Sequence, residues 1–345
     1  MKKYLSILLI SSLGLGSAFA GNPDRAGSAG ASQLLINPWA ASNGLAGANM
    51  ASTLGLESTF LNVAGLAFIG KTELITANSI YLGGTGIRLN SVGFGTRIGS
   101  SAVLGLTVTS MSFGDIPITT EDLPEGGIGT FSPAFSNIGI SLAKEFSNSI
   151  YAGFTLRIIS ESISNAKASG VAFDAGIRYI TGDDDRMRFG IALRNVGAPM
   201  RYAGDGLTTT GTPQGSDQSM TVLMRSERYE LPSLLNIGLA YDVVKNDNMV
   251  IEMNGQFTSN SFTKDQFGFA TEARFGDNIA LRAGYLYEAG VGTEDDRTTV
   301  YTGPTAGLSL QVPAGSSGSV IAVDYSYRTT NPFNGTHTIG LKITI

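Results

Sequence analysis

The sequence has no cysteine, a single histidine and little charge. Without cysteine the chain can form neither a disulfide nor a thiol nucleophile, and the lone His337 excludes a histidine-based metal cluster. Charged residues make up 15% of the 345 residues, and acidic side chains outnumber basic ones by 28 to 23. This acidic balance argues against a nucleic-acid partner, which would require a basic surface. Nothing in the sequence indicates a metal or another cofactor.

Long hydrophobic runs are also missing after residue 20, where no segment approaches the roughly 18 apolar residues of a membrane helix. The first twenty residues have the pattern of a signal peptide, with Lys2 and Lys3, an apolar stretch, and a small-residue cleavage site ending at Ala20. The apolar stretch is too short for a retained anchor, and no later cysteine could carry a lipid. We expect export with residues 1–20 removed, which changes the formal charge from −5 to −7 by the loss of two lysines.

Glycine is abundant, with 45 residues, which suits a large β-barrel because glycine eases strand curvature and inward packing. From Thr72 onward, strand-like runs alternate with turn signals. We predict an all-β fold, a 14-stranded antiparallel transmembrane β-barrel over residues 72–345. Its predicted strands are 72–82, 85–98, 101–113, 134–146, 150–162, 168–181, 186–198, 232–244, 249–259, 265–275, 279–289, 300–312, 319–329 and 336–345.

The connections between these runs alternate between short and longer ones. Every second connection is a tight turn, as expected on the periplasmic side of an outer-membrane barrel. The intervening connections include two long segments, 114–133 and 199–231, which should then face the outside. A soluble β-sandwich has no reason to sort its loops in this way, so the pattern favours the bacterial outer membrane.

The two faces of the strands differ in polarity. In the run that begins at Ile150, Phe154 and Ile158 point to one side, whereas Thr155 and Arg157 point to the other. The same alternation recurs in the runs that contain Phe189 and Ile237. An apolar outside and a polar inside are the inverse of a soluble barrel, and lipid makes that arrangement stable.

The C-terminal run alternates up to its last residue. Chain ends of soluble proteins usually fray, but this run must pair with the first strand to close a barrel without free edges. It also resembles the C-terminal signal that the outer-membrane assembly machinery recognises, although that signal usually ends in Phe. The matching residues are Thr338, Gly340, Ile343 and Ile345.

Residues 21–71 differ from the rest of the chain because they show no clean alternation and are rich in small residues. About fifty such residues cannot form an independent core. We therefore predict short helical turns and loops that fold into or against the barrel as a plug or hatch segment.

Several stretches resemble the PorV/PorQ family of type IX secretion proteins, which is itself built like the FadL fatty-acid channel. They include Thr59-Phe-Leu-Asn-Val-Ala-Gly-Leu-Ala67, where Val63 replaces the proline of the family motif Asn-Pro-Ala-Gly-Leu. The other stretches are 170–179, 189–199, 231–241, 281–285 and 323–327. The resemblance implies a non-enzymatic FadL-like barrel that binds translocon or attachment-complex proteins and the C-terminal signal domains of exported cargo.

The two long loops carry apolar side chains where water is expected, and such clusters tend to mark partner sites. Two other interpretations stay open: the first loop could fold over the barrel mouth as a lid, and the middle of the second could be disordered. The candidate partner-binding residues are Ile116, Ile118, Leu123, Phe131, Met200, Met220, Leu223 and Met224.

Strand parity also directs charged side chains into the barrel, as either a conduit or a ladder of paired charges that fills the lumen. The set has eight positive and five negative members, so no single sign defines an ion path. Its members are Arg157, Asp174, Arg178, Arg188, Arg194, Asp242, Glu252, Glu272, Arg274, Arg282, Asp324, Arg328 and Lys342.

Two further functions need to be weighed against secretion. A FadL-like channel for hydrophobic small molecules requires an apolar pocket near residues 30–70 and a lateral opening, and a lumen packed shut by arginine–carboxylate pairs would exclude it. An outer-membrane phospholipase could use His337 on the lipid side, but a lone interfacial histidine does not make a catalytic site. We therefore expect no enzyme. A purely structural barrel is a third possibility.

Overall fold

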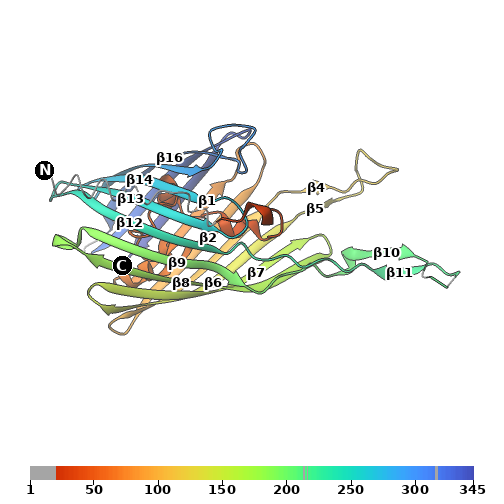
Figure 1. Cartoon of the computed structure of the whole chain (residues 1–345), viewed down its shortest axis with the longest axis horizontal. Helices are drawn as coiled ribbons and strands as arrows, with labels where there is room; N and C mark the ends of the chain where they lie inside the picture. Colours follow the sequence, from red (N-terminus) through yellow and green to blue (C-terminus); the bar gives the residue numbers. More distant parts are fainter. Residues whose placement is uncertain (1–20, 213, 216, 315–317) are drawn as a thin grey trace.

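The computed structural model describes residues 21–212, 214–215, 217–314 and 318–345. In this part of the chain, fourteen antiparallel strands close into a barrel (Figure 1). The predicted signal peptide lies outside the described residues. The barrel strands are β1 (Thr72–Ile80), β2 (Arg88–Ile98), β3 (Ala102–Ser112), β6 (Ala134–Ser147), β7 (Ile150–Ile163), β8 (Ala166–Thr181), β9 (Met187–Gly197), β12 (Leu234–Lys245), β13 (Met249–Asn260), β14 (Gln266–Phe275), β15 (Ile279–Glu288), β16 (Tyr301–Ala314), β17 (Ser319–Thr330) and β18 (Thr336–Thr344). The predicted all-β fold and strand number are thus confirmed.

The last strand closes the barrel against the first. β18 pairs with β1 from Glu73↔Thr344 to Ile80↔His337, and with β17 on its other side. The backbone of Ile345 also bonds in both directions with that of Thr72. A closed ring leaves no free edge, which is the condition for a sheet to span lipid.

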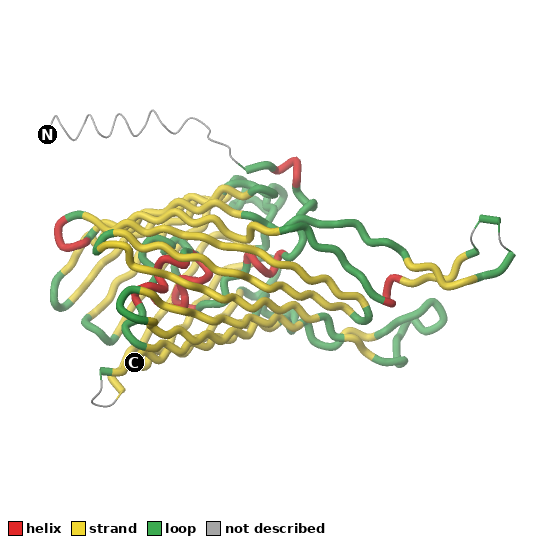
Figure 2. Tube along the Cα trace, turned by 90° about the horizontal axis from the view of Figure 1, so that it is seen from below, coloured by secondary structure: helices red, strands yellow, loops and turns green. Residues whose placement is uncertain are grey.

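The two ends of the barrel are unlike. Tight turns join the strands at the end that holds the C-terminus, whereas the long connections gather at the opposite end (Figure 2). We call these the turn end and the loop end. Two hairpins extend from the loop end: β4 (Ile116–Pro117) with β5 (Thr130–Phe131), and β10 (Thr208–Gly211) with β11 (Met220–Leu223) (Figure 1).

The outer wall is apolar in mid-strand. Ile191 on β9 is paired with Ile177 on β8 and Ile237 on β12, and the exposed fractions of these three side chains are 55%, 55% and 46%. Phe154 and Phe189 are exposed as well, at 51% and 41%. Apolar side chains that face outward at this density fit a lipid environment. Among the described residues, none of the helices is long and apolar enough to cross a membrane.

Residues from about 31 to 70 occupy the inside of the barrel, where Figure 1 shows them as the red and orange turns. Their elements are short: η2 (Ser32–Leu35), α2 (Ala40–Gly44), η3 (Gly55–Glu57), α3 (Ser58–Leu61) and η4 (Val63–Phe68), preceded by η1 (Pro23–Arg25). We call residues 31–70 the plug. Its side chains Trp39, Met50, Leu56 and Leu66 are at most 1% exposed, so the main apolar core lies inside the barrel.

Glycine allows the plug to approach the wall closely. A Cβ built on Gly44 of α2 would lie 2.9 Å from the Cα of Gly307 on β16. A Cβ on Gly176 of β8 would meet the side chain of Asn62 at 2.2 Å. Any larger residue at these positions would push the plug off the wall. Part of the high glycine content is therefore explained by plug packing.

A charge introduced into the outer wall should weaken the barrel. We expect Ile191→Arg to lower the free energy of unfolding by about 2–4 kcal/mol if this position lies near the bilayer midplane, and the control Ile191→Leu to leave it nearly unchanged. Urea titration of the barrel folded in lipid vesicles measures both. An Ile191→Arg barrel as stable as wild type would contradict lipid burial of this face.

Candidate functional site in the barrel lumen

Arginines of the wall hold the plug by its backbone. Arg157 on β7 donates from Nη2 to the carbonyl of Thr59 at 2.8 Å, and Arg178 on β8 donates to the carbonyls of Thr53 and Met50. Such charge-assisted bonds satisfy plug carbonyls that have no partner in regular structure. The wall thus supplies the donors that a segment of short turns lacks.

Asp174 completes this arrangement on the wall side. Its Oδ2 lies 2.6 Å from Nε of Arg157, and both side chains are almost fully buried. Its Oδ1 accepts from the backbone N–H of Asn195, which stands at a bulge in β9 with φ of 57°. Removing one member of a buried ion pair costs about 3–5 kcal/mol, so Asp174 fixes the orientation of Arg157. Arg178, by contrast, has no carboxylate partner among the described residues and is 0% exposed.

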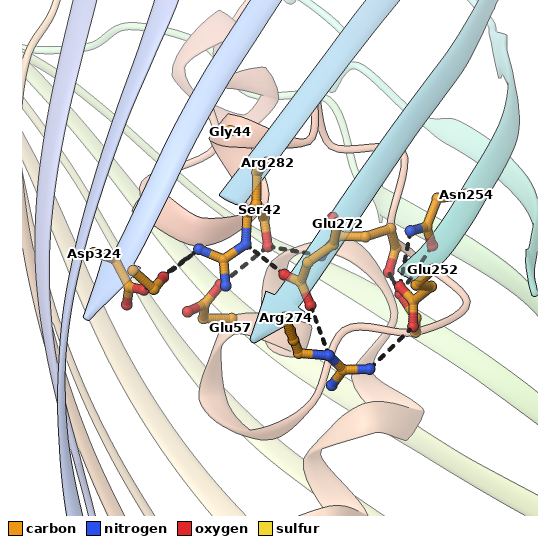
Figure 3. Close-up of polar contacts among 12 residues, drawn as sticks. Ser42, Gly44, Glu57, Glu252, Asn254, Glu272, Arg274, Arg282 and Asp324 are labelled. Carbon is orange, nitrogen blue, oxygen red and sulfur yellow. Dashed lines mark hydrogen bonds and ion pairs between the residues drawn. The ribbon is translucent and has the colours of Figure 1, made fainter. Parts of the chain in front are cut away.

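A second group of charges lines the turn end of the lumen (Figure 3). Arg188 contacts Asp242 and lies 3.3 Å from Glu252. Arg274 reaches Glu272 at 3.3 Å and Glu252 at 3.9 Å. Arg282 contacts Glu272 and lies 3.6 Å from Asp324. Five of these side chains border a cavity of about 200 Å³, which we call the turn-side cavity: Arg188, Glu252, Glu272, Arg274 and Arg282.

Glu57 brings a plug carboxylate into this group. It accepts a hydrogen bond from Ser42 Oγ at 3.1 Å, and Lys342 Nζ lies 4.0 Å from its other oxygen. Burial raises the pKa of Glu57 to about 7, against the lowering effect of Lys342. The protonation of this plug residue therefore changes near neutral pH.

A separate cavity of about 170 Å³ lies toward the loop end, and we call it the loop-side cavity. Its apolar lining includes Leu35, Phe60 and Leu61 of the plug and Leu234 and Leu286 of the wall. The polar lining consists of amides, threonines, Tyr301 and two arginines, and no carboxylate borders it. The cavity therefore combines an apolar surface with two positive charges in its lining.

The two arginines are Arg194 on β9 and Arg328 on β17. They are 5% and 9% exposed, and neither has a carboxylate within ion-pair distance in the described part of the chain. Arg194 lies over the ring of Phe60 at 4.0 Å and bonds only weakly to the carbonyl of Leu34, at 3.4 Å. Arg328 lies over the ring of Tyr301 at 3.8 Å. Buried guanidinium groups without counterions are costly, and a bound anion would relieve that cost.

Plug residues border both cavities. Ala46, Gly47 and Leu61 border the loop-side cavity, whereas Leu45 and Asn49 border the turn-side cavity. The arginine–carboxylate pairs stand around the turn-side cavity and do not fill the loop-side cavity. Plug residues are thus common to both cavities, whereas Arg188, Arg274 and Arg282 border only the turn-side cavity.

The long connection between β9 and β12 is fastened to the plug through one carboxylate. Glu161 on β7 is 3% exposed and accepts hydrogen bonds from Gln33 of the plug and from the hydroxyls of Tyr202 and Tyr229, each at 2.8 Å. Burial and the bond to Glu161 raise the pKa of both tyrosines, so they stay donors. We call this arrangement the Glu161 latch.

One candidate partner residue does not lie where the sequence suggested. Met200 is 2% exposed and packs with Leu34, Ile159 and Leu231 beneath the latch. Its position next to the end of β9 carries it under the loop, so the prediction of an exposed partner site is wrong for this residue. Glu161 and Gln33 were not predicted as site residues, although strand parity directs Glu161 inward.

The other candidate partner residues lie on the two hairpins. Their exposed fractions are 38% for Ile116 and Ile118, 51% for Leu123, 47% for Met220, 66% for Leu223 and 55% for Met224. Phe131 is half-buried. The interpretation of the first loop as a lid does not fit its extension away from the barrel (Figure 2), and the middle of the second loop pairs in part as β10–β11.

The residues of the predicted assembly signal lie at the end of the chain, with Thr338, Gly340 and Ile343 on β18 and Ile345 directly after it. Thr338 is 1% exposed and bonds to Ser79 inside the barrel, Gly340 also faces inward, and Ile345 faces out. The assembly signal remains a prediction. His337 Nδ1 lies 2.8 Å from the hydroxyl of Tyr325. The phospholipase hypothesis would instead require a serine beside this histidine. No cluster of metal-binding side chains is found among the described residues.

Comparison with known proteins was made at the level of sequence and of structure. No protein-family model matches the chain, and no curated protein matches it. Solved structures do match. The Pseudomonas putida toluene transporter TodX has a TM-score of 0.57 at 11% identity, with 89% of this chain and 97% of that chain covered.

Two further structures agree. The CymD monoaromatic hydrocarbon channel has a TM-score of 0.54 at 14% identity, covering 89% of this chain and 96% of that one. A Pseudomonas aeruginosa FadL homologue has a TM-score of 0.53 at 15% identity, covering 88% and 97%. The fold is FadL-like. A FadL-like barrel with an apolar outer wall points to the bacterial outer membrane.

The raised pKa of Glu57 predicts a pH effect on stability. Its folded-state pKa is about 7 and its ordinary value 4.5, so the folded protein holds this proton more tightly than the unfolded chain. The stabilisation is full below about pH 4.5 and is lost as the pH rises through about 7. We expect wild type to lose more unfolding free energy than Glu57→Gln over this range, measured by urea titration at fixed salt. Parallel pH profiles would contradict the assignment.

Proposed function

We propose that the chain is an outer-membrane channel for small amphipathic molecules that combine an apolar body with an anionic group. The observation that carries the proposal is the loop-side cavity, where Arg194 and Arg328 have no counterion beside the apolar side chains of Leu35, Phe60 and Leu286. A carboxylate head would pair with the guanidinium groups, and its hydrocarbon tail would occupy the apolar lining.

The likeness to solved channels supports transport as the class of function. TodX is described as a toluene transporter and CymD as a monoaromatic hydrocarbon channel. In this chain the plug stands between the loop-side and turn-side cavities, so passage requires a shift of plug residues near Ala46 and Leu61. The plug is then the hatch of the channel.

Binding should depend on the charge of the ligand head. We expect purified wild type in a non-ionic detergent to bind dodecanoate more tightly than dodecanol, as measured by isothermal titration calorimetry. Arg194→Gln and Arg328→Gln should each weaken dodecanoate binding about tenfold or more, because each removes a charge-assisted bond. Dodecanol binding should change little.

The matched control is Arg201→Gln, which removes an exposed loop arginine of the same chemistry. It should leave both affinities unchanged. Equal binding of dodecanoate and dodecanol by wild type, or loss of dodecanoate binding in the control alone, would contradict an anionic ligand in this cavity.

A second candidate function is protein binding at the cell surface, as the resemblance to the PorV/PorQ family implies. The specific observation in its favour is that both hairpins extend beyond the barrel and carry exposed apolar residues, among them Leu123 and Leu223 (Figure 1). Apolar side chains at the tip of a hairpin fit a partner better than they fit water. The partners would be translocon or attachment-complex proteins, or the C-terminal signal domains of exported cargo.

This second function predicts hairpin-dependent capture. A tagged wild-type barrel should recover secretion components from solubilised outer membranes, and Leu223→Asp with Met224→Asp should reduce that recovery, since removing a central apolar contact costs about 2 kcal/mol or more. Thr209→Asp on the same hairpin is the control. Equal recovery by all three proteins, or recovery of no secretion component by wild type, would count against the hairpins as a docking site.

A further inference from the structure

The connection between β3 and β6 carries charge of one sign. Residues 114–133 contain four carboxylates and no basic side chain, and we call this segment the acidic hairpin. Glu121, Asp122 and Glu125 are exposed, and in the described part of the chain none of them takes part in an ion pair. The exposed apolar side chains of the same segment are Ile116, Ile118, Leu123 and Ile128. The acidic hairpin thus presents negative charge beside apolar surface.

The base of the β10–β11 hairpin holds a cavity of the opposite charge. Its volume is about 300 Å³, and we call it the hairpin cavity. Residues 201–204, 207 and 223–226 line it, with Arg201 and Arg225 as the charged members and no carboxylate. Both arginines are exposed, and neither has an ion-pair partner among the described residues. The aliphatic side chains of the lining include Leu207, Leu223 and Met224. The cavity suits an apolar side chain that stands beside carboxylates.

Backbone hydrogen bonds hold the hairpin cavity in shape. Ala203 bonds in both directions with Lys167 of β8, each time at 2.9 Å, so one arm is fixed to the barrel wall. The N–H of Met224 donates to the carbonyl of Leu207 at 2.9 Å and joins the two arms. A cavity that is already formed loses little conformational entropy when a partner enters it.

The two hairpins flank the same part of the wall. The strands around the barrel follow the order β3, β6, β7, β8, β9 and β12. The acidic hairpin joins β3 to β6, and the β10–β11 hairpin joins β9 to β12. β7 and β8 therefore lie midway between them, and both hairpins project beyond the loop end (Figure 1).

A second copy of the chain can engage both hairpins at once. Copies inserted in the same direction share one outside, so a symmetric pair has its twofold axis along the membrane normal. With this axis beside β7 and β8, the acidic hairpin of each copy faces the hairpin cavity of the other. The facing walls gain little from contact, because lipid is as apolar as they are. The hairpins must then supply the specificity of the pair.

We propose that the chain forms a twofold dimer in which the acidic hairpin of each copy docks at the hairpin cavity of the other. Leu123, which stands between Asp122 and Glu125 in sequence, enters the cavity. The neighbouring carboxylates pair with Arg201 and Arg225 of the other copy. The dimer is independent of the anionic ligand, because no residue of the lumen takes part in it.

Charge reversal tests this pairing from both sides. The first variant carries Arg201→Glu with Arg225→Glu, and the second carries Glu121→Lys with Asp122→Lys. We expect each variant alone to dimerise about tenfold more weakly than wild type or worse, since like charges then face each other at both contacts. An equimolar mixture should dimerise nearly as well as wild type, because every reversed hairpin meets its complement. Sedimentation equilibrium in a non-ionic detergent measures all four samples, and recovery in the mixture shows that both variants are folded.

The control for charge reversal is Glu294→Lys with Asp295→Lys, which changes two exposed carboxylates elsewhere at the loop end and should leave dimerisation unchanged. Because the chain has no cysteine, the contact can also be cross-linked. Copies with Leu123→Cys mixed with copies with Leu223→Cys should give a dimer with a bismaleimide, whereas either alone should not. A wild type that stays monomeric at every concentration, or a double-cysteine chain that cross-links only within itself, would overturn the inference.

Discussion

The structure depends on hydrogen bonds between wall side chains and the backbone of the plug. A closed barrel in lipid has a polar inside that must be satisfied, and a plug of short turns has carbonyls without partners. Arg157 and Arg178 meet both requirements, because they donate to the backbone carbonyls of Thr59 and Thr53. Near the turn end, Arg97 donates in the same way to the carbonyls of Ala67, Ile69 and Gly70. Neither the wall nor the plug is complete alone.

The two ends of the lumen use charge differently. At the turn end, Arg188, Arg274 and Arg282 each contact carboxylates, and Glu57 ties the plug to that group through Ser42 and Lys342. At the loop end, Arg194 and Arg328 contact aromatic rings and no carboxylate of the described chain. Paired charges stiffen the first region, whereas the two arginines of the second have no such partner in the described chain. The proposed binding of an anionic ligand rests on this difference.

Strand periodicity made much of the fold predictable. Alternation at Phe154, Phe189 and Ile237 gave the lipid-facing side, and the sorting of short and long connections gave the two ends of the barrel. Parity also directed the charged residues inward. It could not say which of them are paired, because that depends on register between strands and on where the plug lies. Arg188 has carboxylate partners whereas Arg178 and Arg194 have none in the described chain, and only the three-dimensional structure distinguishes them. The prediction for Met200 was wrong for the same reason, because the residues of the cluster that buries it are distant in the sequence.

The account depends most on the occupant of the loop-side cavity. An electron cryomicroscopy or crystal structure of the wild-type barrel with dodecanoate measures this directly. We predict density for the carboxylate in the loop-side cavity, against the guanidinium group of Arg194 or Arg328, with the alkyl chain along the apolar lining and the plug still inside the barrel. An empty cavity at saturating dodecanoate, or a plug that lies outside the barrel, would contradict the account.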